Sequence, residues 1–226
     1  MQDKMELKRI AVVRTEFPEK FGVPRQSGLA ETLGKVVFEP EYRSPDAFRG
    51  LEEYSHVWLL WGFSEVKQKN WHATVRPPRL GGNTRMGVFA TRSPFRPNPI
   101  GLSCVKLIDV QQTAKEGTVL IIEGVDIMDG TPVYDVKPYL PYADCKPDAS
   151  GGFAEQHKND ELQVIFEEGM EERVPEEKRA VLRQVLAQDP RPSYQEDPER
   201  IYGMDYAGMR IRFRVKEDQL IVCSVE

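Results

Sequence analysis

Six short segments with strand character follow one another in the first 127 residues, with almost no helical pattern between them. They are residues 9–15, 36–39, 56–63, 86–91, 102–110 and 118–127, and loops rich in Gly and Pro separate them. Residues 56–63 form a nearly continuous apolar run, which is typical of a buried strand. Strands that follow one another without intervening helices predict an antiparallel β-barrel or sandwich, and they argue against a doubly wound parallel sheet.

A change in sequence character marks residues 143–156, which are small and polar and therefore indicate a linker. Beyond it, residues 162–168 have the composition of a strand, and residues 175–188 carry the apolar stripe of an amphipathic helix. Residues 209–216 alternate strictly between apolar and basic side chains. A turn connects them to the apolar residues 219–225, so this end of the chain predicts a hairpin.

Together these patterns predict a mainly β, or α+β, protein in two parts. We expect an N-terminal antiparallel β-barrel domain at residues 1–146, which folds alone, and a small C-terminal α/β unit at residues 157–226. No apolar stretch reaches the roughly 18–20 residues that a membrane span needs, and the N-terminus shows no secretory signal. We therefore expect a cytoplasmic protein that makes no membrane contact.

Several kinds of site are excluded by missing motifs. The chain contains no GxGxxG, no P-loop and no GxSxG sequence, which argues against a Rossmann domain, a P-loop enzyme and a serine hydrolase. Cys104, Cys145 and Cys223 are far apart and form no CxxC pair, which favours a reducing compartment. The three histidines are equally scattered, so no metal site is expected.

The charge is distributed unevenly along the chain. Residues 66–108 contain eight Lys and Arg and no Asp or Glu, a local charge of +8 in a chain of net charge −5, so the remaining residues carry −13. Such segregation is costly unless an anion binds there or acidic faces offset it. Prolines separate these arginines, and because proline fixes φ, the loop backbone is stiff. We interpret the segment as a preorganised anion-binding site.

Three motifs give the chain a family resemblance. Residues 78–103 read PRLGGNTRMGVFATRSPFRPNPIGLS, residues 50–61 read GLEEYSHVWLLW and residues 126–142 read DIMDGTPVYDVKPYLPY. In this order they resemble the TsaA/TrmO-like family of S-adenosylmethionine-dependent tRNA methyltransferases, over residues 5 to about 145. The sequence LAQDPRPSY at residues 186–194 resembles the C-terminal extension of the longer bacterial form.

The resemblance implies a small β-barrel that binds its methyl donor without a Rossmann fold, and a homodimer whose active site lies near the subunit interface. It also implies transfer of a methyl group from S-adenosylmethionine to the exocyclic nitrogen of threonylcarbamoyladenosine beside the anticodon. Many family members carry His where this chain has Ser64. Carried over by motif, the donor-binding residues are Pro24, Arg25, Gln26, Phe63, Ser64, Arg92, Leu102, Glu123, Gly124, Val125 and Asp126.

The implied substrate needs a basic surface, because an anticodon loop presents splayed bases on a charged backbone. The expected tRNA-binding residues are Arg76, Arg79, Arg85 and Arg96, with Lys67 and Lys69 at the periphery. The basic face of residues 210–216 is a second candidate contact. Its alternative role is a solvated sheet face that pairs with the acidic run at residues 167–177.

Three residues are candidates for catalysis. The N–H of threonylcarbamoyladenosine lies between an aromatic ring and a carbonyl, so a positioned proton acceptor would assist its methylation. Asp126 and Asp129 are the candidate acceptors, and Tyr134 could orient the base. The alternative is that both aspartates belong to a hairpin turn. Likewise Arg25 and Arg92 suit the donor carboxylate, but they would also suit ordinary ion pairs with glutamates.

Two other functions compete with the methyltransferase. A non-catalytic RNA-binding β-barrel would use the same arginines to bind phosphate and would bind no donor. A metal-dependent nucleotide hydrolase would use Asp126, Asp129 and Asp135 to hold Mg²⁺. The sequence disfavours the hydrolase, because arginine dominates the rest of the candidate site.

Overall fold

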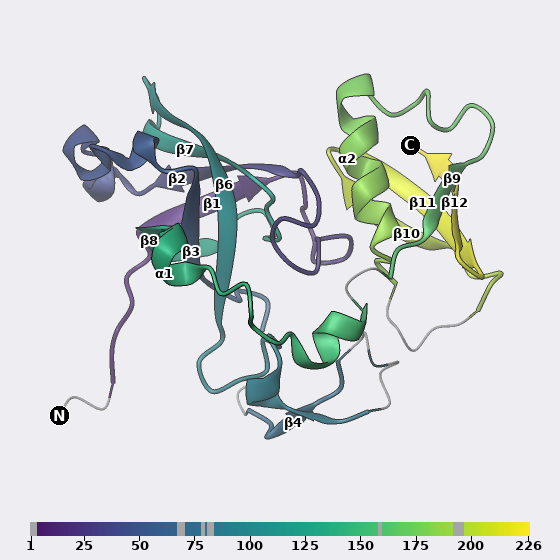
Figure 1. Ribbon diagram of the computed structural model, residues 1–226. Coiled ribbons are helices and arrows are strands. Elements are labelled where there is room, and N and C mark those ends of the chain that lie inside the picture. The colour runs from purple at the N-terminus through teal and green to yellow at the C-terminus, as the bar shows by residue number, and fades with distance from the viewer. Residues whose placement is uncertain (1–3, 67–70, 78–79, 81–83, 158–159, 192–196) are drawn as a thin grey trace.

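The N-terminal half of the chain is a closed six-stranded β-barrel with the strand order β1-β2-β7-β6-β3-β8 (Figure 1). This computed structural model describes all residues except 1–3, 67–70, 78–79, 81–83, 158–159 and 192–196. The barrel strands are β1 (Ala11–Thr15), β2 (Leu33–Phe38), β3 (His56–Gly62), β6 (Ile100–Thr113), β7 (Gly117–Glu123) and β8 (Pro132–Pro138). Every neighbouring pair is antiparallel, so the predicted antiparallel barrel is confirmed.

Alternating apolar side chains fill the barrel. In β3 the side chains of Val57, Leu59 and Trp61 point inward and are buried, while those of His56, Trp58 and Leu60 are only half-buried. The same alternation in β6 buries Val105 and Leu107. This period of two is what a strand with one core-facing side requires.

The basic segment departs from the expected strand at residues 86–91. Only Met86–Gly87 forms a strand, β5, which pairs with β4 (Thr74–Val75), and a 3₁₀ helix follows at Val88–Ala90. The turn buries Val88 and leaves Phe89 exposed. Further 3₁₀ helices span Pro40–Tyr42, Pro45–Phe48 and Leu51–Glu53.

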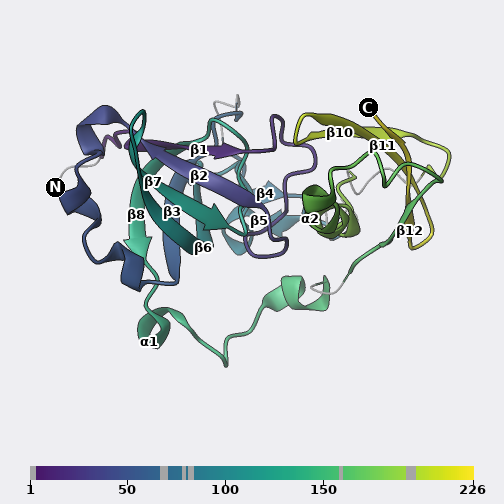
Figure 2. The same ribbon diagram turned by 90° about the horizontal axis from the view of Figure 1, so that it is seen from above.

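The C-terminal unit is a four-stranded sheet of order β10-β11-β12-β9 with one helix beside it (Figure 2). Its elements are β9 (Gln163–Phe166), α2 (Glu176–Ala187), β10 (Tyr202–Tyr206), β11 (Met209–Lys216) and β12 (Gln219–Val225). The predicted helix and the hairpin of β11 and β12 are confirmed. Strand β10 was not predicted, and β9 pairs in parallel with β12.

The loop between β1 and β2 contributes to the core of the C-terminal unit. Phe17 and Ala30 are buried in the same apolar cluster as Leu182 and Phe213, so the two parts share a core. The backbone N–H of Ala207 also donates to the Glu16 carbonyl at 3.0 Å. Independent folding of residues 1–146 and the boundaries of the two parts stay predictions.

The connection between the two parts contains more structure than a linker. It includes α1 (Pro141–Asp144) and a 3₁₀ helix at Gly152–His157, and it runs along the lower edge of the view in Figure 2. Among the described residues, no helix has the length and apolar character needed to cross a membrane. A cytoplasmic location stays a prediction.

Candidate active site

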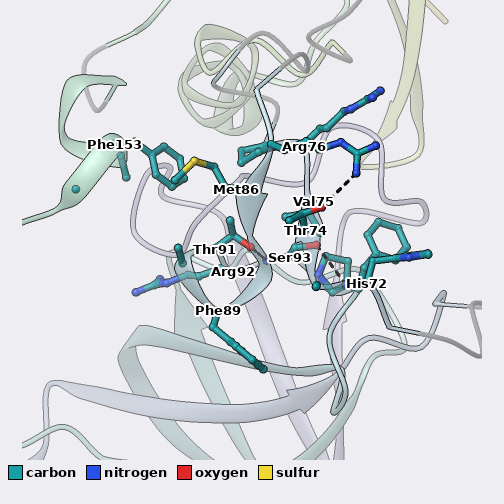
Figure 3. A pocket seen from close by; sticks show the side chains of 18 of the residues that line it. His72, Thr74, Val75, Arg76, Met86, Phe89, Thr91, Arg92, Ser93 and Phe153 are labelled. Atoms are coloured by element: carbon teal, nitrogen blue, oxygen red, sulfur yellow. Dashed lines mark hydrogen bonds between the residues drawn. The ribbon is translucent and has the colours of Figure 1, made fainter.

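A cavity of about 1600 Å³ opens against the basic segment (Figure 3). This volume exceeds the roughly 300–1,000 Å³ of a pocket for one small ligand, so the cavity has room for more than one small group. Among the residues that the structure describes, those that line the cavity include four arginines and three phenylalanines, and none of them is Asp or Glu. They come from four separate stretches of the chain: Arg25 and Gln26, residues 72–77, residues 85–86 and 89–95 of the next stretch, and residues 151–154.

Two arginines lie at the ends of the small β4–β5 ribbon. Arg76 follows β4 and Arg85 precedes β5, so the ribbon places both side chains at the cavity wall. The guanidinium of Arg85 donates to Thr74 Oγ1 at 3.3 Å. Arg96, in contrast, donates to the Thr91 carbonyl at 3.1 Å and does not line the cavity. Arg96 therefore shapes the loop.

Gln26 and Arg92 connect two distant segments at the cavity wall. The Arg92 guanidinium donates to the Gln26 side-chain oxygen at 2.5 Å. The loop that carries Gln26 is fixed to the end of β7, because the Gly28 N–H donates to the Gly124 carbonyl at 2.9 Å. Gly124 has φ of +81°, and a Cβ there would lie 3.1 Å from the Gly28 backbone, so glycine is required for this approach.

Asp126 lies just beyond this contact and is mostly shielded from solvent. Its Oδ1 accepts a hydrogen bond from the Ser103 hydroxyl at 2.6 Å. Burial raises the pKa of the Asp126 carboxyl, and the Ser103 hydrogen bond, backbone N–H groups including that of Ser27, and the charge of Arg92 oppose the increase. A carboxyl of this kind accepts protons more readily than an exposed aspartate does.

Arg25 is engaged with the C-terminal unit. Its guanidinium donates to the carbonyl of Asp189 at 2.5 Å and reaches that of Arg191 at 3.5 Å. The neighbouring Pro24 is buried. Arg25 therefore joins the cavity wall to the segment that follows α2.

The chain matches two family models, together over nearly its whole length. Residues 12–145 match the tRNA-methyltransferase O N-terminal domain, and residues 159–226 match the TrmO C-terminal domain. This chain belongs to the tRNA methyltransferase O family. Its similarity to individual family members extends over both parts of the chain.

Two curated relatives and one solved structure illustrate the similarity to the tRNA methyltransferase O family. The tRNA (adenine(37)-N6)-methyltransferase of Escherichia coli is 44% identical over 98% of this chain and 97% of its own. The enzyme of the same name from Eikenella corrodens is 44% identical over 76% of this chain and 97% of its own. The crystal structure of TrmO from Pseudomonas aeruginosa has a TM-score of 0.78 at 33% identity, and the match covers 99% of each chain.

The other predicted donor residues lie around the same end of the barrel but do not line the cavity. Phe63 follows β3, packs on Trp61 with ring centroids 4.4 Å apart, and donates its N–H to the Pro99 carbonyl at 3.1 Å. Ser64 and Leu102 are exposed. Glu123 pairs with Lys106 at 2.9 Å, and Val125 is buried in the barrel core.

Asp129 and Tyr134 have contact partners different from those of Asp126. The Asp129 carboxylate accepts the Thr15 N–H at 3.0 Å and lies 3.4 Å from the Arg14 guanidinium, so it closes a turn beside β1. The Tyr134 hydroxyl lies over Gly62, where a Cβ would be 2.6 Å away. Both roles proposed for these residues in catalysis stay predictions.

The carboxylates proposed for a magnesium site have different partners. Asp126 accepts from Ser103, Asp129 from Thr15, and Asp135 pairs with Lys137 at 2.8 Å. Within the described part of the chain, no group of three or more His, Cys, Asp or Glu could hold a metal ion.

A stacked aromatic pair is an addition to the predicted site: Phe89 lines the cavity, and Trp71 packs on Phe89 without lining it. Trp71 and Phe89 stack with centroids 6.3 Å apart at 27°, and they are 50% and 74% exposed. Phe153 enters the cavity from the segment that we expected to be a linker (Figure 3). For Trp71 and Phe89, the available signal was an aromatic side chain inside a strongly basic stretch. Lys67, Lys69 and Arg79 lie outside the described residues.

The basic face of β11 is paired with carboxylates. Arg214 lies 3.2 Å from Glu167, and Arg210 lies 2.9 Å from Asp205. Arg212 has a longer contact, 3.7 Å, with Glu226. These pairs favour the solvated, internally balanced face over a second tRNA contact.

Proposed function

We propose that this chain methylates N6 of adenine 37 in tRNA, with S-adenosylmethionine as the methyl donor and the threonylcarbamoyl form of the base as the acceptor. The observation that carries the proposal is the arrangement of Gln26, Arg92 and Asp126 beside a large cavity with a basic wall. The family relationship supports the same activity.

The residues at the barrel end fit the donor chemically. Its carboxylate tail matches the Arg92 guanidinium, which Gln26 already orients. The close approach of Gly28 and Gly124 holds the loop that carries Gln26 against the end of β7 without side-chain crowding. Phe63 offers an aromatic face to a cationic centre. When bound, S-adenosylmethionine supplies an activated methyl group on a positively charged sulfur.

The cavity wall fits the modified base. The threonyl group adds a carboxylate to adenosine, and Arg76 and Arg85 are the cavity arginines on the ribbon side. In Figure 3, Arg76 and Arg92 extend from different sides of the cavity, which suits two separate anionic groups. Tyr134 stays the candidate for orienting the base.

Catalysis rests on positioning and on one proton acceptor. Holding two reactants in the correct geometry accelerates transfer strongly, because it removes the entropic cost of their encounter. The N6 proton must leave when the new N–C bond forms, and Asp126 is the carboxylate that accepts it. Its raised pKa brings it closer to the pH at which a general base is efficient.

The tRNA itself is held by phosphate and base contacts around the cavity. Arg76 and Arg85 attract phosphates, and Arg79, Lys67 and Lys69 belong to the same basic segment. The exposed Trp71–Phe89 stack suits splayed bases of the anticodon loop, because any base has a face that stacks.

The homodimer implied by the family resemblance is also part of this proposal. Light scattering on the full chain should give twice the mass of the 25.9 kDa monomer. A monomeric mass at concentrations that support turnover would refute the dimer and leave the methyltransferase activity intact.

The activity is tested with one tRNA transcript in two forms, with and without the threonylcarbamoyl group, and with labelled S-adenosylmethionine. We expect label in the modified form alone. Comparable labelling of both forms would refute the acceptor assignment. Absence of donor binding in isothermal titration at high protein concentration would refute the methyltransferase and favour the non-catalytic RNA-binding barrel.

A further inference from the structure

The Trp61 indole lies flat across β6 at the end of the barrel that carries Asp126. Trp61 faces Gly101 in the β3–β6 register, and a Cβ at Gly101 would lie 2.2 Å from the indole ring. Glycine at this position therefore makes room for the indole. The ring extends past Gly101, and its N–H donates to the Ser103 hydroxyl oxygen at 2.9 Å.

Three side chains form a directed hydrogen-bond chain. The Trp61 indole N–H can only donate, so Ser103 must accept from it. The single Ser103 proton is then free to point to Asp126 Oδ1, 2.6 Å away. If Asp126 carried its own proton on Oδ1, two protons would compete for one contact, because Trp61 cannot accept the Ser103 proton. The hydrogen bonds from Trp61 to Ser103 and from Ser103 to Asp126 therefore keep Oδ1 an acceptor, and an incoming proton binds to Oδ2.

Burial strengthens these two hydrogen bonds. Ser103 is 1% exposed and Trp61 is 8% exposed, so water does not compete for their hydrogen bonds. A buried hydroxyl costs stability unless it is satisfied, and here both partners are supplied. The other groups that act on Asp126 are the Arg92 charge and backbone N–H groups including that of Ser27.

We propose that Ser103, held by Trp61, is a positioning residue that orients the Asp126 carboxylate and assigns proton uptake to Oδ2. The proton acceptor of the methyl transfer is then preorganised from inside the barrel. The catalytic consequence rests on the proposed function, whereas the orientation of Asp126 does not.

The first test follows the Asp126 carboxyl carbon by NMR across a pH titration of the full chain, without donor. Ser103→Ala removes a bond that stabilises the ionised form, so its midpoint should move to higher pH than in the wild type. Thr118→Val is the matched control. Thr118 is also a buried hydroxyl that accepts from one side chain, Gln112, and donates to one carbonyl, that of Arg43.

The control variant should leave the Asp126 midpoint unchanged. An unchanged midpoint in Ser103→Ala would overturn the proposal. Should Ser103→Ala fail to fold, Trp61→Phe replaces it, since this change removes the indole N–H and frees the Ser103 hydroxyl to rotate. Trp61→Phe should broaden or shift the same titration, and a wild-type titration curve there would equally overturn the proposal.

The second test measures turnover at saturating donor and tRNA. Ser103→Ala should lower it on the order of tenfold, as loss of one hydrogen bond to a charged group implies, with KM little changed. Ser103→Thr retains the hydroxyl and should restore most of the rate. In an Asp126→Asn background, Ser103→Ala should cost nothing further, and an additive loss would contradict the coupling. A wild-type chain without turnover, combined with a shifted NMR midpoint, would refute the proposed function and leave the role of Ser103 intact.

Discussion

The Arg92 guanidinium lies 2.5 Å from the side-chain oxygen of Gln26, although the two residues are 66 positions apart in the chain. This contact connects the loop after β1 to the basic segment before β6. Burial raises the pKa of Asp126, which lies after β7, and the charge of Arg92 opposes this increase. Three segments that are remote in sequence are therefore coupled electrostatically at one end of the barrel.

Arg92→Ala should weaken binding of S-adenosylmethionine at both low and high salt. A hydrogen bond to a charged group contributes about 1.5–3 kcal/mol, which corresponds to a loss in affinity of about 10- to 150-fold. Isothermal titration with the donor measures it. Arg49→Ala is the control, because Arg49 is exposed and pairs only locally with Asp46. Equal affinities in the two variants would exclude Arg92 from the donor site.

The barrel was predictable because its alternating strands need only local sequence. The same holds for β11 and β12, whose boundaries follow the alternation in residues 209–216. Strand β8 was missed because proline occupies both of its ends, Pro132 and Pro138, and proline normally argues against a strand. The shared core could not be predicted, since nothing local in Phe17 indicates which distant residues bury it.

Arg76→Ala and Arg85→Ala should each weaken tRNA binding by a similar factor for all sequences. If each arginine contacts one phosphate, each variant should reduce the slope of log K against log salt by about one. Filter binding across a salt series measures the slope. Donor affinity should stay unchanged in both variants. A slope equal to that of the wild type would place these arginines away from the RNA backbone.

Trp71→Ala and Phe89→Ala should weaken tRNA binding without changing the salt slope. Stacking of one base on an aromatic ring contributes about 1–3 kcal/mol, so a loss of at least fivefold is expected. Trp71→Phe should retain most of the affinity, and quenching of Trp71 fluorescence gives a direct reading of base contact. Tyr142→Ala is the control, because Tyr142 is 85% exposed and does not line the cavity. Wild-type affinity in both aromatic variants would contradict the stacking role.

Phe17→Ala should destabilise the barrel and the C-terminal unit together. Phe17 is 1% exposed and lies in the apolar cluster of the C-terminal unit, and loss of a buried Phe costs about 3–5 kcal/mol. Urea unfolding followed by tryptophan fluorescence and by circular dichroism should show one shared transition at lower urea. Phe89→Ala removes an exposed ring and should leave the midpoint unchanged. Two separate transitions would support independent folding of residues 1–146.

The site was less predictable than the fold, for a physical reason. The motif gave Gln26, Arg92 and Asp126, which the structure brings together. The motif contains Ser103 but does not indicate its role, because the role of a buried serine depends on the partners that folding places beside it. Arg25 illustrates the same limit, since its carbonyl partners lie more than 160 residues away in the chain.

The free energy of unfolding of Asp126→Asn should increase relative to that of the wild type as the pH rises. Burial raises the folded pKa of Asp126 above the unfolded value of about 3.9, so ionising this carboxyl costs folding free energy. Below the unfolded pKa the carboxyl is protonated in both states, and the variant should differ from the wild type only by a constant. As the pH rises through the folded pKa, the wild type should lose stability relative to the variant.

Asp144→Asn provides a control of opposite sign. The Leu140 N–H and the Trp58 indole N–H hydrogen-bond to the Asp144 carboxylate and lower its pKa, so its ionised form stabilises the fold. This variant should therefore lose stability at neutral pH, and the loss should disappear as the pH falls through the folded pKa. Thermal unfolding of the three proteins from pH 3 to pH 8 measures both differences. If the two variants moved in the same direction with pH, the raised pKa of Asp126 would be refuted, and with it the reason for choosing this carboxylate as the proton acceptor.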